Sequence, residues 1–124
     1  MALTFRTQVR EFSQVTILDI AGRVALGDGS KDLTKEIGQL VLKGRAQIVL
    51  NLAEATYFDS SGLGELVSSF STVKSAGGKL KLLHVPPKIE ALLRMTKLET
   101  LFERFSDERE AVASFHENSQ AASA

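Results

Sequence analysis

Six consecutive positions of the chain hold a group of residues suited to chemistry at a helix end: Asp59, Ser60, Ser61, Gly62 and Gly64. A short apolar run, Ile48 to Leu52, precedes this segment, and apolar residues at helical spacing follow it. The pattern predicts a strand, a turn and the first turn of a helix. Open α/β sheets expose their functional surface at such strand ends, so we expect a functional turn here.

Two interpretations fit these residues. In the first, they only cap the helix, because Asp and Ser side chains accept hydrogen bonds from free N–H groups and stabilise the helix by about 1 kcal/mol each. In the second, a serine hydroxyl receives a phosphoryl group, whose charge of about −1.5 to −2 is favoured by the helix dipole and the free N–H groups. Capping explains one polar residue well, but not three in a row. Gly62 and Gly64 would leave room for the backbone of a partner protein.

Other reaction chemistries find little support. The chain has no cysteine, and its two histidines, His84 and His116, fall on separate predicted elements. No glycine stands two residues before Ser60 or Ser61, so a hydrolase elbow is absent, and the sequence contains no P-loop or dinucleotide-binding fingerprint. We therefore expect no enzyme, no cofactor and no metal site. The 15 basic and 15 acidic residues balance, which argues against a nucleic-acid-binding protein that relies on a basic field.

The elements that position the turn follow from spacing. Alternating residues from Leu3 to Val9 predict a half-buried strand near a sheet edge, and Val15 to Ile20 predicts an antiparallel neighbour. The glycine-rich stretch 21–30, which includes Asp28, predicts a loop. The remaining expected elements are a helix from Ser30 to Gly44, a strand over 47–52, a helix from Ser61 to Gly77, a strand over 79–85, a helix that begins at Pro86-Pro87, a connector over 98–105 with room for a short strand, and a helix capped by Asp107. This order predicts an α/β fold with a mixed four- to five-stranded sheet and about four helices.

Length and hydropathy predict a single domain. We place it at residues 1–116, with a flexible tail at 117–124. The first residues alternate apolar and polar side chains, unlike a signal peptide, and no apolar run approaches the roughly 20 residues of a membrane span. We expect a cytoplasmic protein.

The segment Phe58 to Gly64, preceded by Ile48 to Leu52, resembles the signature of STAS-domain anti-sigma factor antagonists. The resemblance covers roughly Leu3 to Phe115 and includes Ala21-Gly22-Arg23 after the second strand. It implies a bacterial partner-switching protein. The unphosphorylated form would bind an anti-sigma factor that is also a serine kinase, and so release a sigma factor. The kinase would then phosphorylate the antagonist with ATP, and a serine phosphatase would reset it.

The resemblance also implies roles for single residues. Ser60 would be the phosphoacceptor, Ser61 the helix N-cap, and Asp59 a residue that shapes the turn and contacts the partner. Gly62 would serve docking and Leu63 packing. Many family members carry an acid shortly after the glycine that matches Gly22; here that position is close to Ala25, and Asp28 stands a few residues later. Asp28 takes that place, or this protein handles its kinase differently.

The same family suggests an alternative function. STAS domains also serve as scaffolds or regulatory subunits of larger sensory or transport complexes. That interpretation predicts a larger self-assembly surface or an extra sensory region. The sequence leaves the oligomeric state open, as well as the identity of the sigma factor, the kinase and the phosphatase.

Overall fold

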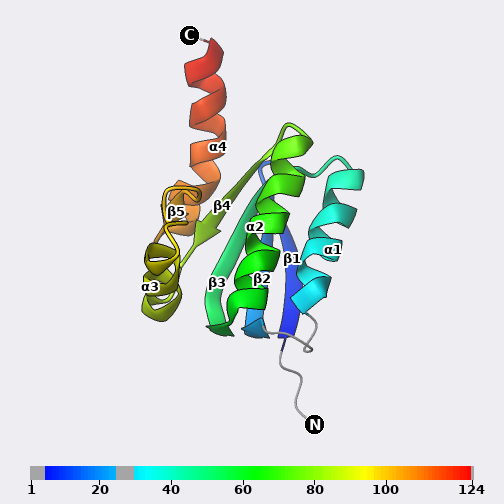
Figure 1. Cartoon of the computed structure of the whole chain (residues 1–124). Coiled ribbons are helices and arrows are strands. Elements are labelled where there is room, and N and C mark those ends of the chain that lie inside the picture. Colours follow the sequence, from blue (N-terminus) through cyan, green and yellow to red (C-terminus); the bar gives the residue numbers. More distant parts are fainter. Residues whose placement is uncertain (1–4, 25–29, 124) are drawn as a thin grey trace.

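A five-stranded sheet lies at the centre of the molecule (Figure 1). We describe residues 5–24 and 30–123 of a computed structural model. The strands follow one another across the sheet in chain order: β1 (Phe5–Phe12), β2 (Val15–Val24), β3 (Gln47–Phe58), β4 (Lys79–Leu83) and β5 (Arg104–Phe105). β1 and β2 pair antiparallel, and the other neighbours pair parallel. The predicted antiparallel edge strand is therefore confirmed.

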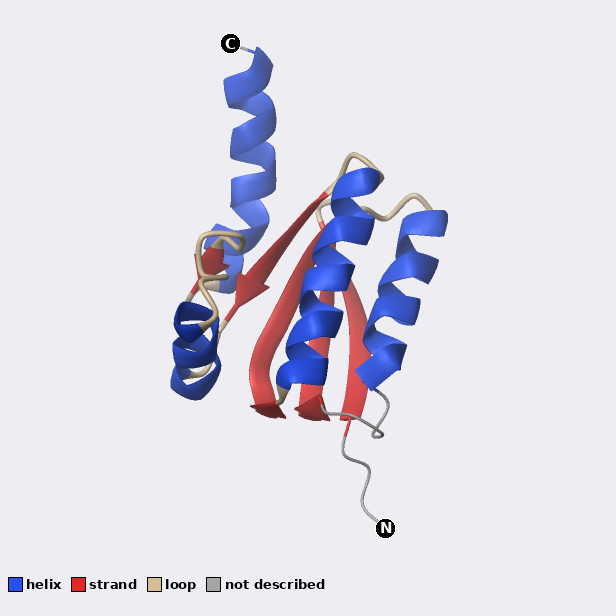
Figure 2. Ribbon diagram, in the orientation of Figure 1, coloured by secondary structure: helices blue, strands red, loops and turns tan. Residues whose placement is uncertain are grey.

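Four helices accompany the sheet in the described part of the chain: α1 (Ser30–Leu42), α2 (Ser60–Ser75), α3 (Pro87–Met95) and α4 (Glu108–Ser123). Figures 1 and 2 show α1 and α2 side by side across one face of the sheet, with α3 beside the end of β4. The predicted α/β class, with a mixed sheet and about four helices, is confirmed. None of the helices in the described ranges is both long enough and apolar enough to cross a lipid bilayer.

Alternate residues of the strands enter two separate cores, as expected when successive side chains point to opposite faces. Leu18, Leu50 and Leu82 belong to the larger core, which α1, α2 and α3 cover. Ile17, Val49 and Leu83 belong to the smaller core, which Ala111 and Phe115 of α4 cover. The sheet is thus sandwiched, with its second face covered by one helix.

Two strands are longer than the sequence indicated. The expected loop over 21–30 was wrong in its first part, because β2 continues to Val24. The expected strand over 47–52 was short, because β3 continues to Phe58. Beyond Asn51, β3 pairs with β2 only, so its residues are partly exposed and lose the continuous apolar pattern. Gly22 takes φ 95° beside a register shift in this ribbon, where glycine adopts the conformation without steric cost.

The C-terminal ends of α1 and α2 and the first turns of α3 and α4 match the expected signals. Gly44 and Gly77 follow α1 and α2 with φ 81° each, the left-handed conformation typical after a helix C-terminus. Pro87 occupies the first turn of α3. The Asp107 carboxylate accepts hydrogen bonds from the N–H groups of Arg109 and Glu110. The backbone of α4 continues to Ser123, so the segment expected as a tail is largely helical; the domain boundary at 116 stays a prediction.

Candidate functional site

The turn between β3 and α2 places the residues that the sequence singled out. β3 ends at Phe58, Asp59 is the N-cap, and Ser60 is the first residue of α2. The Asp59 carboxylate accepts a hydrogen bond of 2.9 Å from the Gly62 N–H. Asp59 adopts extended backbone geometry (φ −101°, ψ −170°), which is usual for a capping residue.

The expected cap at Ser61 was therefore wrong. β3 runs straight into the helix, so Asp59 meets the first free N–H groups and takes the capping role, while Ser61 already lies inside the first turn. This assignment removes Ser60 from capping as well. The serine side chains at positions one and two of α2 are left for other roles.

Ser60 is exposed at the first position of the helix. A helix N-terminus carries a partial positive charge, and its first N–H groups point out along the axis. The first turn of α2 contains no acidic residue, so Asp59 contributes the carboxylate closest in sequence. A phosphate on Ser60 would therefore be formed at an end of the helix that stabilises anions.

Gly62 does not offer its surface to a partner, contrary to the expected docking role. It is buried, and a Cβ atom there would come within 2.1 Å of the Val24 carbonyl oxygen. That carbonyl also accepts a hydrogen bond of 3.4 Å from the Asp59 N–H. The end of β2 is thus the backbone that approaches Gly62. Gly64 is different: it is exposed, and a Cβ atom there would meet nothing within 4 Å.

Two apolar side chains anchor the turn. Phe58 and Leu63, on either side of the polar residues, are both buried in the larger core. The packing role expected for Leu63 is confirmed. Anchors on both sides hold the exposed Ser60 on a rigid element.

An apolar groove opens beside this turn. A cavity of about 490 Å³ lies between the end of β3 and the start of α3, and its walls include Tyr57, Pro87 and Leu92. Tyr57 is 44% exposed, and the Arg23 guanidinium lies 4.7 Å from the centre of its ring. Lys88 also lines the groove. The groove thus has an apolar floor and cationic groups at its edge, and one of its walls is the end of β3, which leads to Ser60.

Asp28, the other residue expected at the site, lies outside the described residues. Val24, the last described residue before it, contacts the turn between β3 and α2 through its carbonyl group. The chain therefore leaves β2 directly beside Asp59.

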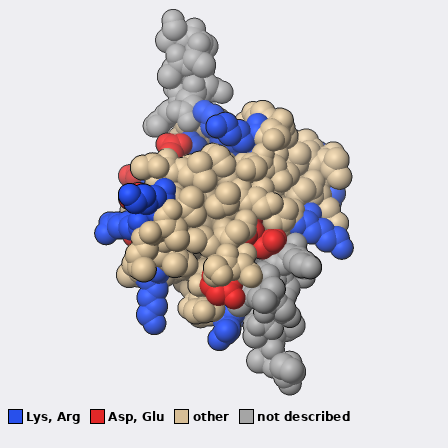
Figure 3. All heavy atoms as spheres, viewed as in Figure 1, with Lys and Arg blue, Asp and Glu red and all other residues tan. Residues whose placement is uncertain are grey.

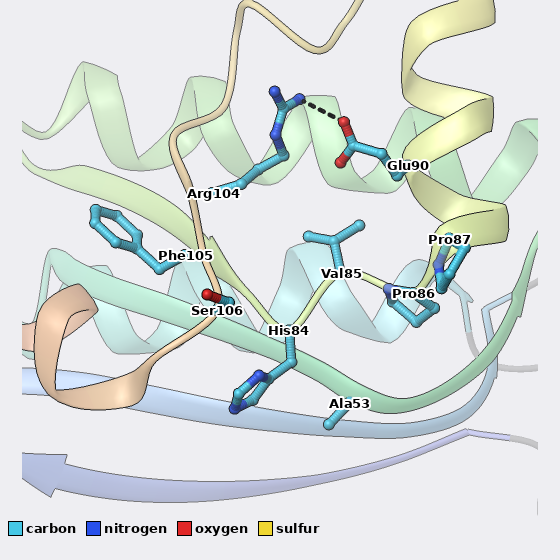
Figure 4. A pocket seen from close by; sticks show the side chains of 9 residues that line it. All are labelled: Ala53, His84, Val85, Pro86, Pro87, Glu90, Arg104, Phe105 and Ser106. Carbon is cyan, nitrogen blue, oxygen red and sulfur yellow. Dashed lines mark ion pairs between the residues drawn. The ribbon is translucent and has the colours of Figure 1, made fainter.

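A second cavity, larger than the apolar groove, lies elsewhere, between the β4–α3 connection and β5. It has a volume of about 770 Å³ and is shown in Figure 4. Arg104 and Glu90 form an ion pair of 3.4 Å on one side of it, and Arg94 binds the same carboxylate at 3.5 Å. Glu90 is thus held by two cations. His84 lines this cavity, and His116 lines another one, so the two histidines lie in different places, as expected.

Sequence reasoning missed a polar cluster on the second face of the sheet. Arg10 on β1 donates to Asp19 on β2 and to Glu108 at the start of α4. Asn51 on β3 donates to the same aspartate at 2.8 Å. Burial by itself would raise the pKa of Asp19, but the hydrogen bonds from Arg10 and Asn51 and the guanidinium charge outweigh burial and lower it. A signal was present, because Asp19 and Asn51 each interrupt an apolar strand and pair in register.

Sequence reasoning also missed a buried lysine. Lys81 on β4 is 1% exposed, and its ammonium group lies 2.8 Å from Ser114 Oγ and 3.1 Å from a Glu103 carboxylate oxygen. The Phe115 ring lies 4.5 Å from the same nitrogen. These contacts join β4 to α4. The sequence places Lys81 between apolar neighbours, which is the one sign of its burial.

Metal and nucleic-acid sites are not suggested by the described residues. Within them, no three His, Cys, Asp or Glu side chains gather in a way that could hold a metal ion. Figure 3 shows the Lys and Arg side chains spread around the edge of the visible face rather than gathered into one basic stripe.

Comparisons with known proteins agree with this architecture. The STAS domain family model matches residues 6–111. The anti-sigma-B factor antagonist of Bacillus subtilis (strain 168) is 34% identical over 58 residues, which cover 47% of this chain and 53% of that protein. The match thus spans about half the length of this relative.

Solved structures share the fold. A putative anti-sigma factor antagonist from Thermotoga maritima superposes with a TM-score of 0.77 at 22% identity, covering 87% of this chain and 92% of that one. The anti-sigma factor antagonist SpoIIAA in its unphosphorylated form gives a TM-score of 0.66 at 18% identity, covering 90% and 98%. At these identities the likeness shows a common fold.

Proposed function

Since this chain belongs to the STAS domain family, we propose that it is an anti-sigma factor antagonist whose binding is switched by phosphorylation of Ser60. The observation that carries the proposal is the position of Ser60, exposed at the first residue of α2 while Asp59 caps the helix. The partial relative from Bacillus subtilis, named an anti-sigma-B factor antagonist, supports the same role.

The unphosphorylated surface would bind the partner. Ser60, the exposed Gly64 and the apolar groove beside Tyr57 together offer a largely apolar surface with the cationic side chains of Arg23 and Lys88 at its edge. An anti-sigma factor with serine kinase activity would dock there and release its sigma factor. Such a partner works where transcription takes place, so a cytoplasmic location belongs to the same proposal.

Phosphorylation would change the charge of this surface without unfolding it. The Ser60 hydroxyl oxygen attacks the γ-phosphorus of ATP on the kinase, the bond to ADP breaks, and the hydroxyl proton passes to a base of the kinase. The product carries about two negative charges next to Asp59. The N-terminus of α2 stabilises that charge, while the partner meets an anionic group in place of the uncharged Ser60 hydroxyl. A serine phosphatase would restore the hydroxyl.

An affinity capture from native lysate tests the proposal. The baits are the wild-type chain, Ser60→Glu and, as a matched control one residue along the same helix turn, Ser61→Glu. We expect wild type to capture an ATP-dependent serine kinase that phosphorylates the purified chain, and Ser60→Glu to lose it. Mass spectrometry of the phosphorylated product should place the phosphate on Ser60, and Ser60→Ala should accept none.

Two results would contradict the switch. A captured kinase that modifies Ser61 and spares Ser60 would move the phosphoacceptor by one residue. Equal capture of other STAS proteins or of transport subunits by wild type and Ser60→Glu would favour a scaffold or regulatory subunit instead.

A further inference from the structure

The first strand leaves one edge of the sheet open. β1 is eight residues long and, within the described residues, pairs with β2 only. An unpaired strand edge presents N–H and C=O groups that can bind another strand. Which groups face outward follows from the turn that joins β1 to β2.

The β1–β2 turn fixes the orientation of each backbone group. Ser13 and Gln14 have φ values of 50° and 69°, typical of a two-residue hairpin turn. Phe12 and Val15 close this turn and form a hydrogen-bonded pair, and the pairs alternate from there along the ladder. The N–H and C=O groups of Thr7, Val9 and Glu11 therefore point away from β2.

This edge lacks the usual protection against association. β1 contains no proline or lysine, and no register shift interrupts its pairing with β2. Two of its three charged side chains are engaged within the chain, Arg10 with Asp19 and Glu108, and Glu11 with Arg45; the third, Arg6, is exposed. Val9 and Phe12 are 39% and 53% exposed. A long, regular edge with exposed apolar side chains favours strand addition.

We propose that a second copy of this chain pairs with β1, antiparallel and with a two-fold axis at Val9. The outward N–H and C=O groups of one strand must bind those of the other. Because these groups belong to odd-numbered residues, the two strands can pair only in registers that place odd-numbered residues opposite one another. Moving the two-fold axis to Gln8 would place Arg6 opposite Arg10, and moving it to Arg10 would place Arg10 opposite itself. The register centred on Val9 places Gln8 opposite Arg10 and Thr7 opposite Glu11, with no like charges facing.

The same register gives partners to both exposed apolar side chains. Val9 meets Val9 of the second copy at the axis, and Phe12 lies opposite the exposed Arg6, within reach of a cation–π contact. The result is one continuous ten-stranded sheet. β1 contributes no residue to the Ser60 turn, so this inference does not depend on the proposed switch.

A proline at the axis tests the pairing. Val9→Pro removes an N–H that points away from β2, so the β1–β2 ladder keeps its hydrogen bonds. Val9→Thr is the matched control, because it keeps both the N–H and the branched side chain. By sedimentation velocity over a concentration series, wild type and Val9→Thr should dimerise and Val9→Pro should stay monomeric. Wild type that is monomeric throughout, or a dimer that survives Val9→Pro with native circular dichroism, would overturn the proposal.

Crosslinking decides the matter if Val9→Pro fails to fold. The chain has no cysteine, so each introduced thiol is unique. Val9→Cys should crosslink to itself with a short thiol-specific reagent, because paired Cα atoms lie about 5.5 Å apart. Leu42→Cys, an exposed position on α1, should not. A mixture of Thr7→Cys and Glu11→Cys should give the mixed dimer. The proposal would be contradicted if Leu42→Cys crosslinked to itself as efficiently as Val9→Cys. This register would be contradicted if Thr7→Cys crosslinked with Val9→Cys instead of with Glu11→Cys.

Discussion

Gly62 and Gly64 stand two positions apart on α2 in opposite surroundings. We expect Gly62→Ala to destabilise the fold by about 1–3 kcal/mol, because the new Cβ meets the backbone of Val24 and not a mobile side chain. Gly64→Ala has open space and should leave the fold as stable or up to about 1 kcal/mol more stable. Urea unfolding of both variants checks this, and equal losses would refute the assigned contact.

Gly64 also separates partner binding from folding. If a partner's backbone approaches α2 at this exposed glycine, Gly64→Ala should weaken capture of the kinase while leaving the unfolding midpoint unchanged or raised. The measurement is the affinity of the purified pair. An unchanged affinity would show that the partner's backbone stays clear of this position.

Ser69 is a buried residue of α2 whose hydroxyl has no hydrogen-bond partner among the described residues. Removing an unsatisfied hydroxyl recovers its desolvation cost, and alanine is the better helix former. We expect Ser69→Ala to raise the free energy of unfolding by about 1 kcal/mol. Exposed Ser68→Ala is the control for helix propensity alone, and a gain no larger than that of the control would mean that the hydroxyl is satisfied.

At the scale of single residues, the sequence predicted the turn between β3 and α2 but not which of its residues caps the helix. Asp, Ser and Ser all cap helices well, so composition cannot choose among them. The choice depends on where β3 ends, which is set by its pairing with β2. The burial of Gly62 against Val24 joins residues 38 positions apart, and local patterns carry no trace of it. The assignment of Ser60 as phosphoacceptor stays a prediction.

α4 is held on the sheet by a buried cation. Ser114→Ala leaves the Lys81 ammonium without one of its partners and should cost about 1–3 kcal/mol. Adding Lys81→Met should recover much of that loss, because an apolar side chain of similar length needs no partner there. Urea unfolding of the single and double variants tests this. A double variant less stable than Ser114→Ala would show that the charge itself stabilises α4.

The polar cluster of Arg10, Asp19 and Glu108 ties β1, β2 and α4 together and should make stability depend on pH. The pKa of Asp19 is lowered in the folded protein, so the folded state binds this proton less readily than the unfolded state. The ionised carboxylate contributes fully to the free energy of unfolding above the pKa of Asp19 in the unfolded chain, about 4. This contribution is lost as the pH falls through the lower pKa of Asp19 in the folded protein. Asp19→Asn should unfold with a shallower loss of stability below pH 4 than wild type. Identical acid profiles would exclude this role.

At the scale of elements, the sequence predicted most helices and strands, because caps, glycines and apolar spacing are local signals. The predicted strands were shorter than β2 and β3, because the C-terminal ends of these two strands are half exposed and lack a continuous apolar pattern. It also took Lys81 as an ordinary strand residue, because its partners Glu103 and Ser114 lie far along the chain.

The whole molecule is formally neutral, with 15 basic and 15 acidic residues, so a phosphate changes its charge balance more than its fold. We expect the chain phosphorylated on Ser60 to be as stable as the unmodified one, or more stable by about 0.3–1 kcal/mol at low salt. Thermal unfolding of both forms at two salt concentrations is the measurement. A phosphorylated form that melts well below the unmodified one would mean that the modification acts by disrupting α2.

The identical order of strands in the chain and in the sheet bears on folding during synthesis. Each strand can join the edge left by its predecessor, so the sheet can grow as the chain leaves the ribosome. The smaller core is completed last, because it includes Ala111 and Phe115 of α4, the last described element. Until α4 docks, Val15, Ile17, Val49 and Lys81 lie uncovered on a growing sheet. The nascent chain is therefore most prone to wrong contacts, and most open to chaperones, just before α4 emerges.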